Sequence, residues 1–541
     1  MHALTVLYGG SLAPQAFAPV LNGRSAFSLA LERAGIFPGS EKTILLAGEN
    51  EIPALPDLEN GITVVRKDRW TLLDLLGVLS KRGTGYDFVY YAWADAPFLD
   101  GDLAGRIAAR HVRFAAEYSY ADGWPYGLGP ELINAAAAGI LCKIAGEAGQ
   151  GPVRRDSLFG VIQGDINSFD IETEISPVDL RYLRLSLTAD SRRNLLLLER
   201  FVRSGSGGPG IDAAGVERII AEHPEYLRTL PAFFPIQAAG PCPPGGGTGA
   251  CPLCPYPRFR GALGKGGDFL DPGDFDKILG KIENFAGDGV ISLSLWGEIA
   301  LHPRREDLIR TVLDRSTLSL LIESSGLGWS IAVLEQIARW AQDAPPRLNG
   351  LPPLSWIVSL NQADLPRLPQ AAGLPQAAGP GESEAAALVK RLVSLFPREP
   401  GGEDRVYAEA VRTAGEEDGI EGFYRAWKAW GASNHGPGII IQKYDYFCGL
   451  LPQKQTVDLS PVERRPCWHI MRDFPVLIDG TVPVCREDME GRMGGVSGLG
   501  NLLREDPQTI WERGTERYRL HCGKTYQDLC AVCDEYYTYN F

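Results

Sequence analysis

The sequence predicts an α/β protein with three domains, two that alternate strands with helices and a third that is rich in cysteine. The chain has 541 residues, which is too long for a single hydrophobic core. Short apolar runs alternate with amphipathic stretches in two separate blocks. Most of the ten cysteines lie in two clusters, at 242–254 and 467–533, with Cys142 and Cys448 outside them. We place the domains at 1–225, 226–455 and 456–541.

The first block has the pattern of a mostly parallel sheet with right-handed crossover helices. Its apolar runs predict strands at 4–8, 43–47, 62–65 and 88–92. Amphipathic stretches predict helices at 25–34, 71–82 and 101–116. Glycine, serine and proline dominate residues 204–210, which we expect to form a surface loop near the end of this domain.

The second block begins near Phe233 and also alternates. Strands are predicted at 290–295, 317–322 and 355–360, with helices at 274–285, 306–314 and 331–341. A full or partial (β/α) barrel fits this alternation, and so does a doubly wound sheet. The repeated hexapeptide at 368–379 is of low complexity and indicates a loop insertion.

Charge and hydropathy narrow the class of protein. The net charge of −14 argues against a nucleic-acid partner, which requires basic surfaces. No apolar run reaches the length of about 18 residues needed to span a membrane. The first residues lack the basic region of a signal peptide, so we expect a cytoplasmic protein. In that reducing compartment, clustered cysteines are more often metal ligands than disulfides.

The central cysteines, Cys242, Cys251 and Cys254, follow the apolar segment 233–236. Three thiolates in one loop hold three irons of a [4Fe–4S] cluster and leave the fourth iron open. A zinc site with a fourth ligand from elsewhere fits the spacing equally well. Downstream, Gly297 and Glu298 follow the strand at 290–295, and other polar residues follow the next two strands.

This arrangement resembles the radical S-adenosylmethionine superfamily, whose cysteines are spaced C-x3-C-x2-C after the first barrel strand. The pair Cys251 and Cys254 matches, whereas eight residues fill the first gap. The resemblance implies a partial (β/α) barrel, a [4Fe–4S] cluster on the three cysteines, and cleavage of S-adenosylmethionine to a 5′-deoxyadenosyl radical. It also implies an electron donor such as flavodoxin or ferredoxin. The implied cofactor contacts are Gly297, Glu298, Ser324 and Ser359, with Glu298 holding the methionine amino group.

The C-terminal cysteines offer a second set of ligands. An Asp-Gly pair at 479–480 predicts a hairpin that brings Cys485 near Cys467. Farther on, Cys530 and Cys533 form a C-x2-C pair, and Cys522 lies nearby. Four thiolates suit either zinc or an iron–sulfur cluster.

The order of these features resembles the SPASM domain, because Cys467, Gly480 and Cys485 match its C-x(9–15)-G-x4-C opening. The resemblance implies one auxiliary [4Fe–4S] cluster on Cys467, Cys485, Cys530 and Cys533, with Cys522 as a replacement or a spare. Together with the segments at 442–445 and 458–473, the chain resembles the spiro-SPASM family, in which a transferase-like domain precedes the other two. That family does not indicate a substrate, whether peptide or carbohydrate.

In the first block, Asp95 follows the fourth strand, where a carboxylate is placed to hold a divalent metal against nucleotide phosphates. Capping of a helix is the alternative. The Asp-x-Pro step at 95–97 and the later segment 180–190 resemble sugar nucleotidyltransferases and related glycosyltransferases. This resemblance implies a Rossmann-like domain, a nucleotide-sugar ligand and a divalent metal at Asp95. The loop at 9–14 lacks the Arg and Lys of that family, so a binding module or a decayed transferase fits at least as well.

Three hypotheses follow for the whole chain. The first is a radical S-adenosylmethionine enzyme with one auxiliary cluster. The second keeps the folds but makes the core catalytically decayed, in a protein that binds or transfers a sugar nucleotide. The third is a structural or interaction protein stapled by zinc.

Overall fold

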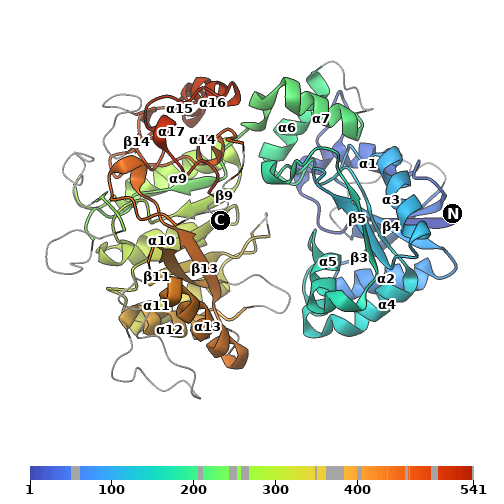
Figure 1. The fold of residues 1–541 in the computed structure, drawn as a ribbon, viewed down its shortest axis with the longest axis horizontal. Coiled ribbons are helices and arrows are strands. Elements are labelled where there is room, and N and C mark those ends of the chain that lie inside the picture. Colours follow the sequence, from blue (N-terminus) through green and yellow to red (C-terminus); the bar gives the residue numbers. More distant parts are fainter. Residues whose placement is uncertain are drawn as a thin grey trace. The chain divides into compact units, whose positions relative to one another are not determined.

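The computed structural model describes residues 1–49, 61–204, 211–242, 253–256, 267–347, 350–360, 383–398, 405–415, 417–434, 436–456, 461, 463–488 and 498–538. The chain divides into two compact units, Met1–Thr229 and Leu230–Arg398 with Glu403–Phe541 (Figure 1). Both are mixed α/β structures built on parallel sheets.

The first unit contains a seven-stranded sheet in the order β3-β2-β1-β4-β6-β5-β7. Its strands are β1 Ala3–Gly9, β2 Ser40–Gly48, β3 Ile62–Lys67, β4 Phe88–Trp93, β5 Tyr118–Asp122, β6 Glu131–Ile133 and β7 Ile171–Ile175. Only β6 among these strands runs antiparallel to its neighbours. The strand order reverses between β1 and β4, and such a switch point opens a crevice at the carboxyl ends of the two strands.

The helices of the first unit are α1 Ala26–Ala34, α2 Leu72–Gly83, α3 Gly101–Arg113, α4 Ala135–Ile144, α5 Ser157–Ile162, α6 Arg192–Arg203 and α7 Ala213–Glu222. Helix α2 starts with a capping box, in which Thr71 and Asp74 exchange side-chain and backbone hydrogen bonds. It packs against α4 (Figure 1). All four predicted strands and all three predicted helices of this block are confirmed.

The second unit contains a six-stranded parallel sheet in the sequential order β13-β12-β11-β10-β9-β8. Its strands are β8 Phe233–Pro235, β9 Gly289–Ser292, β10 Leu318–Ser324, β11 Leu354–Leu360, β12 Val406–Arg412 and β13 Gly438–Lys443. A doubly wound sheet would reverse its strand order, and this one does not. Successive right-handed crossovers in one direction place the connecting helices on a single face and leave the other face for side chains of the interior.

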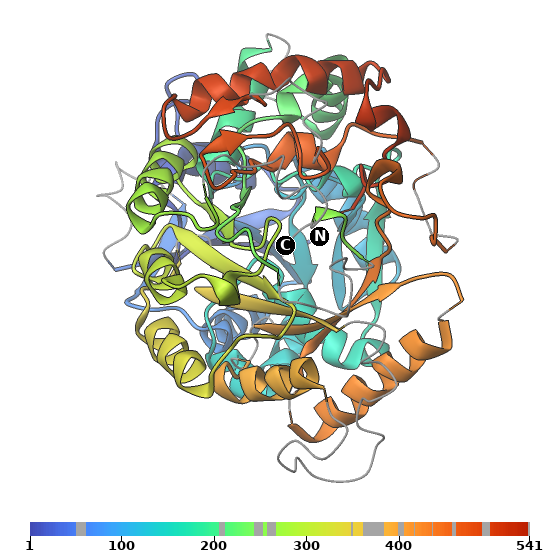
Figure 2. The same cartoon turned by 90° about the vertical axis from the view of Figure 1, so that its left-hand side faces the viewer.

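The connecting helices are α9 Pro272–Ala286, α10 Arg305–Leu313, α11 Ile331–Asp343, α12 Glu384–Leu395 and α13 Glu417–Asn434. In Figure 2 these green, yellow and orange helices form an arc outside the strands. The predicted strands at 290–295, 317–322 and 355–360 are confirmed as β9, β10 and β11, and the three predicted helices as α9, α10 and α11. The low-complexity segment at 368–379 and most of the predicted loop at 204–210 lie outside the described residues.

The C-terminal region consists of short elements: α14 Trp468–Arg472, β14 Thr481–Val482, β15 Gly500–Asn501, α15 Pro507–Arg513, α16 Thr515–Cys522 and α17 Leu529–Val532. The predicted turn is present, because Gly480 has a φ of 82° and its amide donates to the Leu477 carbonyl. Its flanking segments do not form the expected two-stranded ladder. Val476 instead bridges to Ile236 beyond β8, and β14 pairs with β15.

Among the described residues, no helix is both long and apolar enough to span a membrane.

Candidate functional site

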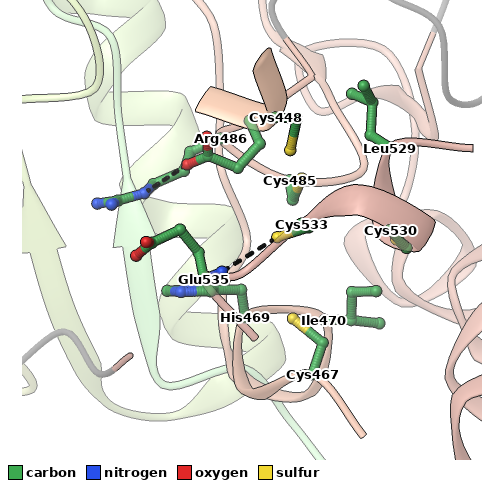
Figure 3. Close-up of a pocket in the computed structure, with 11 residues that line it drawn as sticks. Cys448, Cys467, His469, Ile470, Cys485, Arg486, Leu529, Cys530, Cys533 and Glu535 are labelled. Atoms are coloured by element: carbon green, nitrogen blue, oxygen red, sulfur yellow. Dashed lines mark hydrogen bonds and ion pairs between the residues drawn. The ribbon is translucent and has the colours of Figure 1, made fainter. Parts of the chain in front are cut away.

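Five cysteines of the second unit line one pocket. The four predicted auxiliary ligands, Cys467, Cys485, Cys530 and Cys533, are joined there by Cys448 (Figure 3). The pocket contains about 360 Å³ of space not filled by protein atoms, including space open to solvent. Thiolates gathered in this way are the donor set of an iron–sulfur cluster or a zinc ion.

Three separate short elements place the four predicted ligands. Cys467 precedes α14, Cys485 follows β14, and the pair Cys530 and Cys533 lies on and just after α17. These positions are far apart in sequence, so the pocket depends on the tertiary fold. Cys522, on α16, is not among the described residues that line the pocket.

Cys448 was not predicted as a ligand because it lies outside both sequence clusters. It belongs to a turn of 3₁₀ helix, Phe447–Gly449, that follows β13, and its φ of 52° is unusual for a residue with a side chain. The available signal was its place just beyond the carboxyl end of a strand, where functional residues of parallel sheets gather.

Burial sets the protonation of these thiols. It raises the pKa of Cys467, Cys485 and Cys530, because a thiolate is poorly stabilised away from water. A hydrogen bond from Cys448 lowers the pKa of Cys533 and raises that of Cys448, and the Glu535 amide also donates to the Cys533 sulfur at 3.3 Å. Metal binding here would therefore release protons from buried thiols.

Buried charges surround the pocket and tie it to the sheet. Lys443 at the end of β13 forms ion pairs with Asp534 and Glu535, next to Cys533. Arg486, which follows Cys485, pairs with Glu487 at 3.1 Å (Figure 3). The Lys443 pairs hold the segment that carries Cys533 against the end of β13, and Arg486, which follows Cys485, also lies 3.8 Å from Asp445 just after β13.

Two of the three central cysteines are described. Cys242 is exposed and Cys254 is half-buried, while Cys251 lies outside the described residues. The turn at Trp296 and Gly297 supports both cysteine segments. The Trp296 ring stacks on Tyr256 with centroids 5.7 Å apart, and Cys254 packs against the same apolar cluster.

Gly297 allows the close approach of two backbones at this turn. Its φ is 88°, and a Cβ there would lie 1.9 Å from the Ala239 carbonyl oxygen. The neighbouring Glu298 amide donates to the Pro241 carbonyl at 2.9 Å, one residue before Cys242. The glycine therefore positions the chain that leads into Cys242.

Glu298 is buried, with only 4% of its surface exposed, and accepts four hydrogen bonds from its own chain. One carboxylate oxygen accepts from the Ala300 amide at 3.2 Å and the Ser324 hydroxyl at 3.1 Å. The other accepts from the amide and the hydroxyl of Ser325, both at 2.8 Å. Burial raises the pKa of Glu298, and these donors act in the opposite direction. All lone-pair positions of the carboxylate are thus used within the protein.

One face of the sheet carries an apolar cluster and, next to it toward the carboxyl ends of the strands, polar side chains that include Ser359. The side chains of Phe233, Leu321 and Ile357 form an apolar cluster there, and residues two positions farther along the strands point to the same side. In this way Ser359 on β11 comes beside Glu409 on β12 and donates to its carboxylate. Burial raises the pKa of the neighbouring Glu323 to about 7. Glu409 was missed because no strand was predicted after residue 360.

In the first unit, Asp95 is fully buried at the carboxyl end of β4 and bonded to an arginine. Arg155 donates to its two carboxylate oxygens at 3.2 and 2.5 Å, and forms an ion pair with Asp190 at 3.2 Å. Asp95, singled out from the sequence, and Asp190, the last residue of the segment 180–190, are therefore brought together, with a guanidinium between them.

No family model matches the chain. Solved structures similar to parts of it include BtrN in complex with AdoMet and 2-DOIA, at 16% identity over 57% of this chain and 94% of that chain, with a TM-score of 0.33. A cytidylyltransferase from Leptospira borgpetersenii matches at 14% identity over 42% and 96%, with a TM-score of 0.36. SuiB of Streptococcus suis, bound to precursor peptide SuiA, matches at 12% identity over 66% and 76%, with a TM-score of 0.35. TM-scores this low establish neither a shared fold nor a shared function.

Comparison of amino-acid sequences identifies a relative that matches most of the chain. A Treponema pallidum protein described only as uncharacterized is 33% identical over 390 residues, which cover 71% of this chain and 98% of that protein. A second uncharacterized protein of the same organism matches over 60 residues at 37% identity, covering 11% of this chain and 27% of its own length. The chain belongs to the same family as the first of these Treponema pallidum proteins.

Proposed function

We propose that this protein is an iron–sulfur enzyme of the radical S-adenosylmethionine type, a spiro-SPASM protein that modifies a peptide or a carbohydrate. The observation that carries the proposal is the gathering of Cys448, Cys467, Cys485, Cys530 and Cys533 in one pocket. This pocket adjoins a sheet of six parallel strands in sequential order. Four thiolates satisfy a zinc ion and a [4Fe–4S] cluster equally, and the cluster is favoured by the spacing of Cys467, Gly480 and Cys485, which resembles the SPASM opening.

The auxiliary [4Fe–4S] cluster would take four of these five thiolates. Cys530 and Cys533 lie three residues apart across one helical turn and would bind neighbouring irons. The Glu535 amide, which donates to the Cys533 sulfur, would stabilise a thiolate there and tune the reduction potential of the cluster. Cys448 is either the fourth ligand or the partner that holds Cys533 in position.

The second cluster would be held by Cys242, Cys251 and Cys254. With its open iron it would bind S-adenosylmethionine and supply the electron that cleaves it. The chain's own contribution would be to hold this loop. Gly297 admits the backbone leading into Cys242, and Glu298 ties the end of β10 to the same turn. A contact between Glu298 and the methionine amino group would replace at least one of its four internal hydrogen bonds. Ser324 pairs with Val358, so its side chain points to the sheet face opposite that of Ser359, and only one of the two serines would share a side with this contact.

Anaerobic reconstitution of the full chain with iron and sulfide would test this proposal. Iron, sulfide and zinc are measured, and the EPR spectrum of the dithionite-reduced protein is recorded with and without S-adenosylmethionine. Wild-type protein should hold about eight irons, and the triple Cys242/Cys251/Cys254→Ala variant about four. Only the wild-type spectrum should change when S-adenosylmethionine is added, and only wild type should release 5′-deoxyadenosine.

The other results would each point to a different function. About four irons in wild type, with no spectral change, would indicate an iron–sulfur protein with a decayed core; the fully occupied carboxylate of Glu298 is the observation that favours this second candidate. Zinc in place of iron would refute the radical chemistry and leave a structural role for the cysteines.

A further inference from the structure

The strongest departure from expectation lies at the switch point of the first unit. Asp95 and Asp190 face each other there, because the Ala189 amide donates to the Asp95 carbonyl at 2.9 Å and brings the adjacent Asp190 alongside. A carboxylate at the carboxyl end of a parallel strand, faced by a second carboxylate, is a common place for a divalent cation, and here Asp190 faces Asp95 from the segment before α6. In this chain the position between them is filled by Arg155.

Nitrogen donors take every carboxylate oxygen of this pair. Arg155 binds both oxygens of Asp95 through its two terminal nitrogens, and its Nε binds one oxygen of Asp190. The side-chain amide of Asn194 donates to the remaining oxygen of Asp190 at 2.8 Å. A metal ion could coordinate either carboxylate only by displacing these nitrogens.

Two aromatic rings also contact the guanidinium of Arg155. Its carbon lies 4.4 Å from the centroid of the Trp93 ring and 5.5 Å from that of Tyr126. The surrounding carboxylates raise the pKa of Arg155 despite its burial, so the charge between them is permanent. A planar bidentate pair with aromatic contacts is not readily exchanged for a hydrated cation.

A second observation concerns the phosphate side of the crevice. Trp70 is 5% exposed and donates through its indole nitrogen to the Ala47 carbonyl. Its ring covers Gly10 so closely that a Cβ there would lie 2.4 Å from Trp70 Cδ1. The backbone after β1, which would cradle phosphates at such a switch point, is therefore covered by an indole ring.

We infer that Arg155 permanently replaces the divalent cation in the first unit, so that this unit binds no metal between Asp95 and Asp190. The charge that an ion would supply comes from the protein itself. Metal-dependent transfer of a nucleotide or sugar at this position is thereby excluded. The inference does not depend on the iron–sulfur chemistry proposed for the second unit.

Titration of the full-length protein with Mn²⁺, followed by the EPR signal of the free ion, would test the inference. Mn²⁺ prefers oxygen ligands, and any ion bound by Asp445, Asp534 and Glu535 beside the cysteine pocket contributes equally to wild type and to a variant of the first unit. Wild type and Asp190→Asn, a change at a half-buried residue, should take up equal amounts of Mn²⁺. Uptake by wild type that exceeds Asp190→Asn by one ion per chain would overturn the inference.

A gain of function gives the converse test. Arg155→Ser should bind one additional Mn²⁺ per chain, and the double variant Arg155→Ser/Asp190→Asn should lose it. Arg154→Ser, which removes the adjacent arginine, should behave as wild type. A folded Arg155→Ser protein that gains no ion would refute the replacement, since the two carboxylates would then form no cation site. If this variant aggregates, the Mn²⁺ uptake of wild type compared with that of Asp190→Asn still tests whether an ion binds between the two carboxylates.

Discussion

Replacing Glu298 by glutamine gives a sharp test of how this carboxylate works. Glu298→Gln preserves the size of the side chain and exchanges one acceptor oxygen for an NH₂ group. Because the carboxylate accepts two hydrogen bonds on each oxygen, one side of the amide must then face two donors. Each hydrogen bond to a charged group contributes about 1.5–3 kcal/mol. The amide of Ser325 or that of Ala300 should therefore lose its partner.

Hydrogen–deuterium exchange measures this loss directly at the two amides. In the variant, the Ser325 or the Ala300 amide should exchange about 10- to 150-fold faster, the factor that corresponds to the loss of one such bond. Local exchange is the appropriate measurement, because unfolding of a chain with two units need not be a two-state transition. Glu384→Gln, at an exposed position in the first turn of α12, is the matched control and should leave both amides unchanged.

Exchange within about twofold of wild type at both amides would refute the reasoning. It would mean that the four hydrogen bonds do not hold the end of β10 to the turn before it. Glu298 would then be available to a ligand, and its assignment as a cofactor contact would gain weight. Rapid exchange would instead identify Glu298 as a positioning residue for the segment that follows β10.

Three further predictions follow from the same structure. Cys448→Ser should lower the iron content of the reconstituted protein or broaden its auxiliary EPR signal, whereas Cys522→Ser should leave both unchanged; equal effects would contradict the assignment of Cys448 to the pocket. Gly297→Ala should cost at least about 3 kcal/mol or prevent folding, because the new methyl group would meet a backbone carbonyl at a positive φ. Gly280→Ala in α9, with nothing within 4 Å, should instead stabilise by about 0.5–1 kcal/mol, and similar losses in both variants would count against the steric argument. Burial raises the pKa of Glu131 from 4.5 to about 7, so its contribution to stability is present below pH 4.5 and is lost as the pH rises through 7. Glu131→Gln should therefore raise Tm relative to wild type by more at pH 8 than at pH 5, and the underlying change in the free energy of unfolding should not exceed about 3 kcal/mol; a difference independent of pH would show that the pKa of Glu131 is not raised in the folded protein.

Local patterns in the sequence were sufficient where hydrophobic periodicity is strong. The buried runs of β1 and β4 and the capped helix α2 are examples, since burial and capping leave a signal within a few residues. Strand β6, with three residues, and β7, with alternating acidic residues, carry too weak a signal and were missed. Their position is decided by pairing with β4 and β5 rather than by their own composition.

The candidate site shows the same difference between residues that local sequence patterns identify and residues that only the tertiary fold brings into place. Spacing identified Cys467, Cys485, Cys530 and Cys533, which lie together in the pocket. It did not identify Cys448, because that residue reaches the pocket through the turn after β13, a strand that was not predicted. Sequence spacing reports ligands that share a loop or a hairpin, whereas a ligand delivered by the end of a strand becomes visible only in the fold.

Arg155 illustrates a further limit of prediction from sequence. A motif can indicate where a charged site lies without indicating whether a metal ion or a protein side chain fills it. The motif at 95–97 indicated a carboxylate at the end of a strand, and the structure places Asp95 there with Asp190 beside it. A motif of acidic residues specifies negative charge, but several kinds of positive charge can neutralise it. Here the neutralising group lies 60 residues away on the chain and is held between Trp93 and Tyr126. Whether such a site holds a metal is therefore decided by the third segment that reaches it, and in this unit that segment carries its own cation.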